Sequence, residues 1–123
     1  MTSLVAVLGS GKGSWAALGE IINKEPWDKV FLVTNEFGKE NYSKRIRSSK
    51  ETEFLVLNFE DDVTVLSERI VSFLQGKIPD LEVGVCILSG EGREHTALIS
   101  AVLKLGLSMR IVALSKEGAV IEP

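Results

Sequence analysis

The sequence predicts an α/β fold in which an open, doubly wound sheet carries helices on both faces. Short apolar runs rich in valine, isoleucine and leucine alternate along the chain with amphipathic runs. The apolar runs show little polar alternation, which is typical of parallel strands covered on both sides. In addition, two of these runs lead directly into glycine-rich turns that open helix-like segments. Together these observations indicate repeated strand–helix–strand units.

Five apolar runs are predicted as strands. In order, they are Leu4–Leu8, Val30–Thr34, Glu53–Asn58, Glu82–Leu88 and Met109–Leu114. After the last of these, Gly118 can turn the chain and add a short edge strand from Ala119 to Glu122.

Four runs between the strands are predicted as helices, and their flanking residues support this. The helices are Ser14–Lys24, Lys39–Ser49, Asp62–Gln75 and Glu94–Leu105. Pro26 follows the first, and Asp61 or Asp62 can cap the third. Gly106 stands where a helix C′ glycine belongs.

The alternation of these elements predicts a Rossmann-like sheet of mainly parallel strands with right-handed crossovers. We expect strand order 3-2-1-4-5 and one domain spanning residues 1–123. The first and fourth strands are then neighbours at the point where the strand order reverses. Ligands of such sheets bind outside the carboxyl ends of the strands at this point, so both glycine turns are predicted to form one site.

Composition excludes several classes of protein. No apolar stretch approaches the roughly 20 residues of a membrane helix, and the first apolar run stops at Gly9, unlike a signal peptide. A net charge of −3 argues against general binding of nucleic acid. The single cysteine, Cys86, precludes an intrachain disulfide, fits a cytoplasmic location and is expected in the core. With one histidine and one cysteine, we expect no metal site and no cofactor.

Both glycine turns are suited to binding an anion. The first runs Gly9-Ser10-Gly11-Lys12-Gly13-Ser14, and the second runs Ser89-Gly90-Glu91-Gly92-Arg93 shortly before His95. Backbone N–H groups at such turns bind phosphate, and each turn carries one cation. We therefore expect a ligand with more than one phosphate. The alternative is that the glycines only make tight strand-to-helix turns.

Two familiar phosphate motifs fail on spacing. A Walker A loop needs G-x-x-x-x-G-K-[ST], but Ala6 stands at its first glycine and Gly13 follows the lysine. The dinucleotide fingerprint needs G-x-G-x-x-G, but Ser14 stands at its last glycine. Neither nucleoside triphosphate hydrolysis nor dinucleotide chemistry is favoured.

Other residues near the turns allow two interpretations each. His95 is either a helix-surface residue or a donor to phosphate or ribose and an acid in phosphodiester cleavage. Trp15 either anchors the first helix or stacks on a base. The cations between Lys39 and Lys50 form either a solvated helix face or an extension of the anion groove.

The segment Leu88–Gly106, L-S-G-E-G-R-E-H-T-A-L-I-S-A-V-L-K-L-G, resembles the hallmark of CARF domains, the CRISPR-associated Rossmann-fold sensors. Their fourth strand ends in a T-G-G-T-K-x-M-like turn, followed by an alanine- and leucine-rich helix that closes on glycine. Here Ser89 corresponds to the threonine, Gly90 to the first glycine and Arg93 to the lysine. Glu91 replaces a small residue, and His95 replaces the methionine.

This resemblance implies a homodimer that binds a cyclic oligoadenylate, a cyclic oligonucleotide, across its two-fold axis. The opening run and its turn are similar to the other ligand-contacting segment of the family, and Val30–Asn35 to its second strand. The candidate ligand-binding residues are Gly9, Ser10, Gly11, Lys12, Gly13, Ser14, Thr34, Asn35, Ser89, Gly90, Glu91, Gly92, Arg93 and His95. Family members commonly carry an effector domain, which this sequence lacks, so it resembles either a lone or excised sensor domain or a stand-alone ring nuclease.

Three functions follow as hypotheses. The first is a sensor domain that binds cyclic oligoadenylate or a related anionic nucleotide. The second is a metal-independent ring nuclease, with Ser10, Lys12, Arg93 and His95 as candidate catalytic residues. The third is a regulatory or interaction domain without a small ligand.

Overall fold

A computed structural model describes residues 2–123, apart from the side chain of Lys12. It confirms the predicted α/β class and strand order, because five parallel strands form one sheet in the order β3-β2-β1-β4-β5. The sheet strands are β1 Leu4–Leu8, β2 Val30–Thr34, β3 Thr52–Val56, β4 Glu82–Cys86 and β5 Ser108–Ile111. None of the helices within residues 2–123 has the length and apolar character needed to cross a bilayer.

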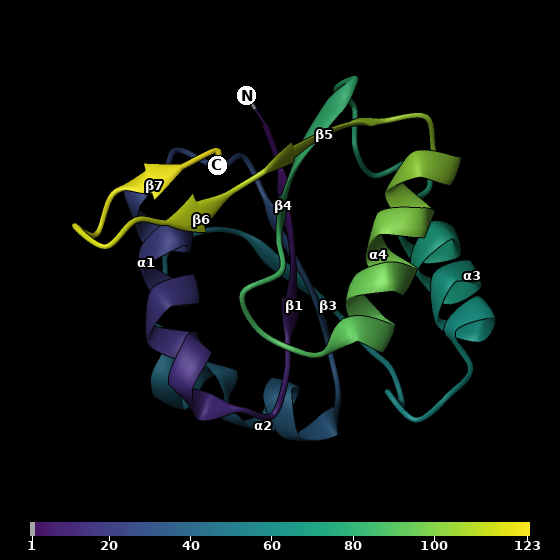
Figure 1. The fold of residues 1–123 in the computed structure, drawn as a ribbon, viewed down its shortest axis with the longest axis horizontal. Coiled ribbons are helices and arrows are strands. Elements are labelled where there is room, and N and C mark those ends of the chain that lie inside the picture. The colour runs from purple at the N-terminus through teal and green to yellow at the C-terminus, as the bar shows by residue number, and fades with distance from the viewer. Residues whose placement is uncertain (1) are drawn as a thin grey trace.

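Helices cover both faces of the sheet, with α1 and α2 on one side and α3 and α4 on the other (Figure 1). Their bounds are α1 Trp15–Lys24, preceded by a 3-10 turn over Lys12–Ser14, α2 Glu36–Arg45, α3 Val63–Leu74 and α4 Gly92–Lys104. Every residue of the central strand β1 is buried. Leu4, Ala6 and Leu8 join the core under α1 and α2, whereas Val5 and Val7 join the core under α3 and α4. An uninterrupted apolar run is therefore what this strand requires.

The boundaries predicted for the second helix, Lys39–Ser49, were wrong. The helix begins at Glu36, because Asn35 caps it by accepting a hydrogen bond from the Gly38 N–H at 2.9 Å. It ends at Arg45, after which Ile46 adopts an extended conformation and enters the core. A glycine in the first turn is needed here, since a Cβ on Gly38 would lie 1.8 Å from the Thr34 hydroxyl.

The predicted last strand divides into two, and the predicted strands at Glu53–Asn58 and Glu82–Leu88 end earlier than expected. After β5, the strand β6 Ala113–Leu114 pairs antiparallel with β7 Val120–Ile121, as a second small sheet beside α1 (Figure 1). The C-terminal run thus forms a strand, but it does not extend the main sheet. Gly118 makes the connecting turn with a φ of 85° and donates its N–H to the Ser115 carbonyl.

One charged cluster predicts a pH dependence of stability. The Glu53 carboxylate of β3 accepts a hydrogen bond from Lys29 and another from Lys77, and these hold its pKa below the ordinary glutamate value. A lowered native pKa stabilises the fold above the unfolded-state pKa, and that contribution disappears as the pH falls through the native value. We expect Glu53→Gln to lower the melting temperature at pH 7 by no more than a few degrees, because the cluster is solvated. The difference from wild type should shrink in melts at pH 3; a constant difference would contradict this.

Candidate functional site

The two glycine turns touch each other at the carboxyl end of the sheet. A Cβ on Gly9 would lie 2.8 Å from both the Cα and the backbone nitrogen of Gly90. The Gly9 N–H also donates a hydrogen bond to the buried Ser89 hydroxyl at 2.8 Å. The predicted proximity of the turns is therefore confirmed, and it follows from the pairing of β1 with β4.

The turns line a groove of about 790 Å³. Its described lining residues are Gly9, Ser10, Gly11, Gly13, Ser14, Asn35, Phe59, Glu60, Leu88, Gly90, Glu91, Gly92, Arg93 and Glu94. The 3-10 turn before α1 and the first residues of α4 both open at this groove. The first N–H groups of a helix have no acceptor within the helix, and the positive end of its dipole favours an anion. Two such helix starts at one groove therefore favour a ligand with separated negative charges.

The glycines of the groove fall into two groups. Gly9 and Gly90 are needed because the turns pack against each other, and Gly90 has a φ of 94°. At Gly11, Gly13 and Gly92, by contrast, a Cβ would meet no atom within 4 Å, and φ is not in the left-handed region. Packing therefore does not explain glycine at these three positions. Because glycine has no side chain, the backbone at these positions can be reached from the groove.

Arg93 lies at the groove and holds a neighbouring loop. Its Nη1 donates to the Phe59 carbonyl at 2.9 Å and lies 3.9 Å from a carboxylate oxygen of Glu60. A guanidinium has five N–H donors, so these contacts leave others for a ligand. The backbone of Lys12 belongs to the 3-10 turn before α1, but its side chain lies outside the described part of the structure.

Ser10 and Asn35 connect the first turn to the start of α2. The Asn35 side-chain amide donates to the Ser10 hydroxyl oxygen at 2.9 Å, while its carbonyl caps the helix. Because the Ser10 oxygen is the acceptor, its own proton can be donated into the groove. Ser14 instead donates its hydroxyl to the Gly11 carbonyl at 3.2 Å.

His95 and Glu94 brace the second turn. The His95 Nε2 lies 2.7 Å from the Ser89 carbonyl oxygen, and since a carbonyl only accepts, this nitrogen carries the proton and donates it. The buried Glu94 carboxylate accepts a hydrogen bond from the Glu91 N–H at 2.8 Å, in a capping box at the start of α4. Glu91 is exposed at the groove rather than paired with Arg93, whose ion-pair partner among the described residues is Glu60.

Several sequence candidates lie beneath the surface. Thr34 is fully buried, and its hydroxyl donates to the Leu8 carbonyl at 2.7 Å, so it does not face the groove. Trp15 is 2% exposed, and its indole N–H donates to the Gly9 carbonyl at 2.9 Å. This confirms the anchoring interpretation of Trp15 over stacking on a base. Cys86 is buried as predicted, and burial raises the pKa of its thiol.

The basic run after Lys39 does not line the groove. Lys44, Arg45 and Arg47 border a separate hollow of about 400 Å³ next to α1. They are exposed, as the interpretation of a solvated surface predicts.

Sequence reasoning missed Phe59, Glu60, Leu88 and Glu94 as lining residues. Phe59 and Glu60 follow β3, and no motif marks them, because the sheet topology alone brings their loop to Arg93. The Glu94 signal was present, since an acidic residue three positions after a helix N-cap is typical of a capping box.

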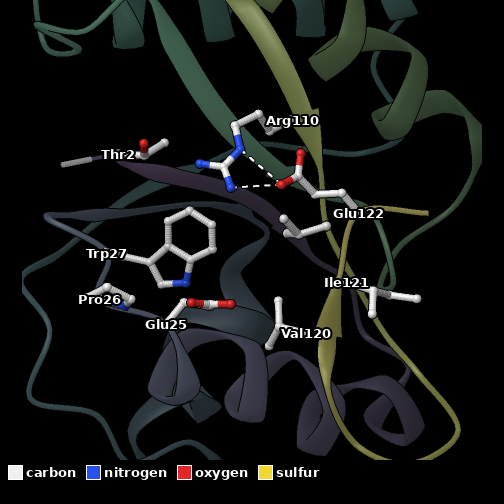
Figure 2. A pocket seen from close by; sticks show the side chains of 9 residues that line it. Thr2, Glu25, Pro26, Trp27, Arg110, Val120, Ile121 and Glu122 are labelled. Atoms are coloured by element: carbon white, nitrogen blue, oxygen red, sulfur yellow. Dashed lines mark hydrogen bonds and ion pairs between the residues drawn. The ribbon is translucent and has the colours of Figure 1, made fainter.

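A second cavity, of about 310 Å³, lies between Trp27 and the C-terminal segment (Figure 2). Arg110 from β5 donates to the Glu122 carboxylate at 2.8 Å and lies 3.5 Å from Glu82. The hydrogen bond and the positive charge of Arg110 hold the pKa of Glu122 below its ordinary value. The indole N–H of Trp27 donates to the Ile21 carbonyl. Arg110, Glu82, Glu122 and the Trp27 indole are thus bonded to the protein itself, whereas the groove at the glycine turns lies at the starts of two helices.

No family model matches this chain, and no curated protein matches it. Within residues 2–123, no group of three or more histidine, cysteine, aspartate or glutamate side chains is placed to hold a metal ion. The chemistry of the groove is therefore the basis for assigning a function.

Proposed function

We propose that the chain is a ligand-binding module whose groove holds an anionic nucleotide, with cyclic oligoadenylate as the ligand that the CARF resemblance indicates. One observation carries the proposal. Two helix starts open at one groove of about 790 Å³ through Gly11, Gly13 and Gly92, where packing does not require glycine. On the same resemblance we propose a cytoplasmic homodimer.

Backbone N–H groups of both turns, the Ser10 hydroxyl and the Arg93 guanidinium supply the donors. Charge-assisted hydrogen bonds of this kind are worth roughly 1.5–3 kcal/mol each. The groove is also lined by the carboxylates of Glu60, Glu91 and Glu94. These repel a ligand with a high charge density. A phosphodiester with one negative charge per phosphate therefore fits better than a nucleoside triphosphate.

The groove favours binding without cleavage over the ring-nuclease hypothesis. The only histidine donates its Nε2 proton to the Ser89 carbonyl, and an acid role would break the bond that braces the second turn. Incubation with cyclic tetra- or hexa-adenylate in chelator, followed by chromatography, tests this. We expect the ring to remain intact; linear products would favour the nuclease.

The proposal predicts a thermal shift with a cyclic oligoadenylate. Ligand at about one hundred times its dissociation constant adds about 2.7 kcal/mol, which corresponds to several degrees for a domain of this size. The screen includes cyclic tri-, tetra- and hexa-adenylate beside ATP, NAD and FMN. If only ATP, NAD or FMN shifts the melting temperature, that nucleotide and not a cyclic oligoadenylate is the ligand. No shift with any of them would contradict binding and favour the interaction domain.

Replacing Arg93 by alanine should weaken cyclic oligoadenylate binding about 10- to 100-fold, because one charge-assisted contact is lost. The matched control is Arg69→Ala on α3, which removes the same charge from an exposed position outside the groove. Titration calorimetry of both variants compares the affinities. Equal affinity of the two variants would show that Arg93 does not contact the ligand.

A further inference from the structure

The groove at the glycine turns continues into a second hollow of about 440 Å³. This hollow lies over the ends of β2 and β3 and is lined by Asn35, Glu36, Phe37, Val56, Leu57, Asn58, Phe59 and Glu60. Asn35, Phe59 and Glu60 line both cavities. The rim of the sheet therefore carries one continuous depression, which extends away from the two helix starts.

The lining changes character along this depression. Beside β1 and β4 it consists mainly of glycine backbone, serine and charged groups, but beside β2 and β3 two phenyl rings enter it. Phe37, in the first turn of α2, is 36% exposed, and its ring centre lies 6.1 Å from that of the buried Trp15. Phe59 packs against the core under α3 and α4. Each ring is thus held by a different core, which fixes an aromatic surface in advance of binding.

The hollow also offers one donor and one acceptor. The Asn58 side-chain oxygen accepts from the Glu60 N–H at 3.0 Å, and its amide NH₂ has no hydrogen-bond partner among the described residues. The Glu36 carboxylate is exposed and lines this hollow. An adenine edge presents an amino donor beside a ring-nitrogen acceptor, and a hollow lined by a carboxylate and an amide NH₂ contains the complementary groups.

We propose that this hollow is the base subsite of the ligand, which takes a purine ring while the phosphates lie at the glycine turns. The inference rests on the proposed function and adds to it the position and the chemical class of the uncharged part of the ligand. A purine fits the two phenyl rings because its faces are apolar and can stack on them. It belongs to the same ligand as the phosphates, since the two hollows share three lining residues.

The test compares ligands with and without the base. The probes are cyclic tetra-adenylate, AMP and ribose 5-phosphate, and titration calorimetry measures each with wild type, Phe37→Ala and Phe59→Ala. We expect each substitution to weaken binding of the adenylates about 10-fold, because base stacking is lost, and to leave ribose 5-phosphate unchanged. Leu103→Ala on α4 is the control, because Leu103 is a largely exposed apolar residue outside both hollows.

The outcomes separate the two proposals. If adenylates bind but both phenylalanine variants match wild type, the base subsite is overturned and the proposed function stands. If neither these probes nor cyclic tri- or hexa-adenylate binds wild type, both are overturned. If an alanine variant does not fold, Phe37→Leu or Phe59→Leu is used in its place. Leucine keeps an apolar side chain but lacks the aromatic face. Undiminished affinity of the leucine variants for the adenylates would also overturn the subsite.

Discussion

Gly90→Ala should lower the free energy of unfolding by about 2–6 kcal/mol, a large effect on stability for the addition of a single methyl group. Gly90 has a φ of 94°, which costs a residue with a side chain roughly 1–3 kcal/mol. Its Cβ would also lie 2.6 Å from Cγ1 of Val7, a buried residue of the central strand. Overpacking of this kind costs about 1–3 kcal/mol more. Urea unfolding followed by circular dichroism measures the change.

Gly92→Ala is the matched control for this prediction. It lies two residues along the same turn, at the first position of α4, and a Cβ there would meet no atom within 4 Å. We expect it to change the free energy of unfolding by less than about 1 kcal/mol, or to stabilise the helix slightly. Equal stability of the two variants would show that the turns do not pack as the structure describes.

The fold could be predicted from the sequence because its main signals are local. The central strands β1 and β2 are almost continuous apolar runs. Parallel strands joined by helices leave few topologies once crossovers are right-handed. The errors fell where a tertiary contact decides the boundary. Gly38 lies outside the predicted second helix, Lys39–Ser49, yet it belongs to the first turn of α2, because the Asn35 side chain accepts its N–H and caps the helix. Glycine is required there because the Thr34 hydroxyl occupies the space that a side chain would need. The last strand divides because Val112 enters the core under α1 and α2.

The candidate site was predicted only in part, for a different reason. Sequence shows that glycines, hydroxyls and cations cluster in two turns, but not which side of a turn each side chain faces. Thr34 and Ser89 are both buried: the Thr34 hydroxyl donates to the Leu8 carbonyl at the end of β1, and the Ser89 hydroxyl accepts from the Gly9 N–H. Phe59 has no local signal at all, because β3 and the loop after it reach the groove only through the order of the sheet. A hydroxyl that holds a turn and one that binds a ligand are identical in sequence.

Gly92→Asp should abolish most of the ligand affinity without harming the fold. A carboxylate at the first position of α4 interacts favourably with the helix dipole, and the space around Gly92 is open. The same carboxylate would stand where the proposal places a phosphate. At an effective dielectric constant of 20, two unit charges about 5 Å apart repel by roughly 3 kcal/mol, which corresponds to an affinity loss on the order of 100-fold.

Gly92→Asn separates charge from size in this experiment, since its side chain has nearly the same shape as aspartate but no charge. We expect Gly92→Asn to bind cyclic tetra-adenylate within a few-fold of wild type and to melt at a similar temperature. Titration calorimetry at two salt concentrations adds a second criterion, because the gap between the two variants should narrow as salt screens the repulsion. Equal affinities for aspartate and asparagine would mean that no phosphate lies at the start of α4. The ligand would then have to be sought elsewhere along the rim, because the open glycine of this turn would have no binding role.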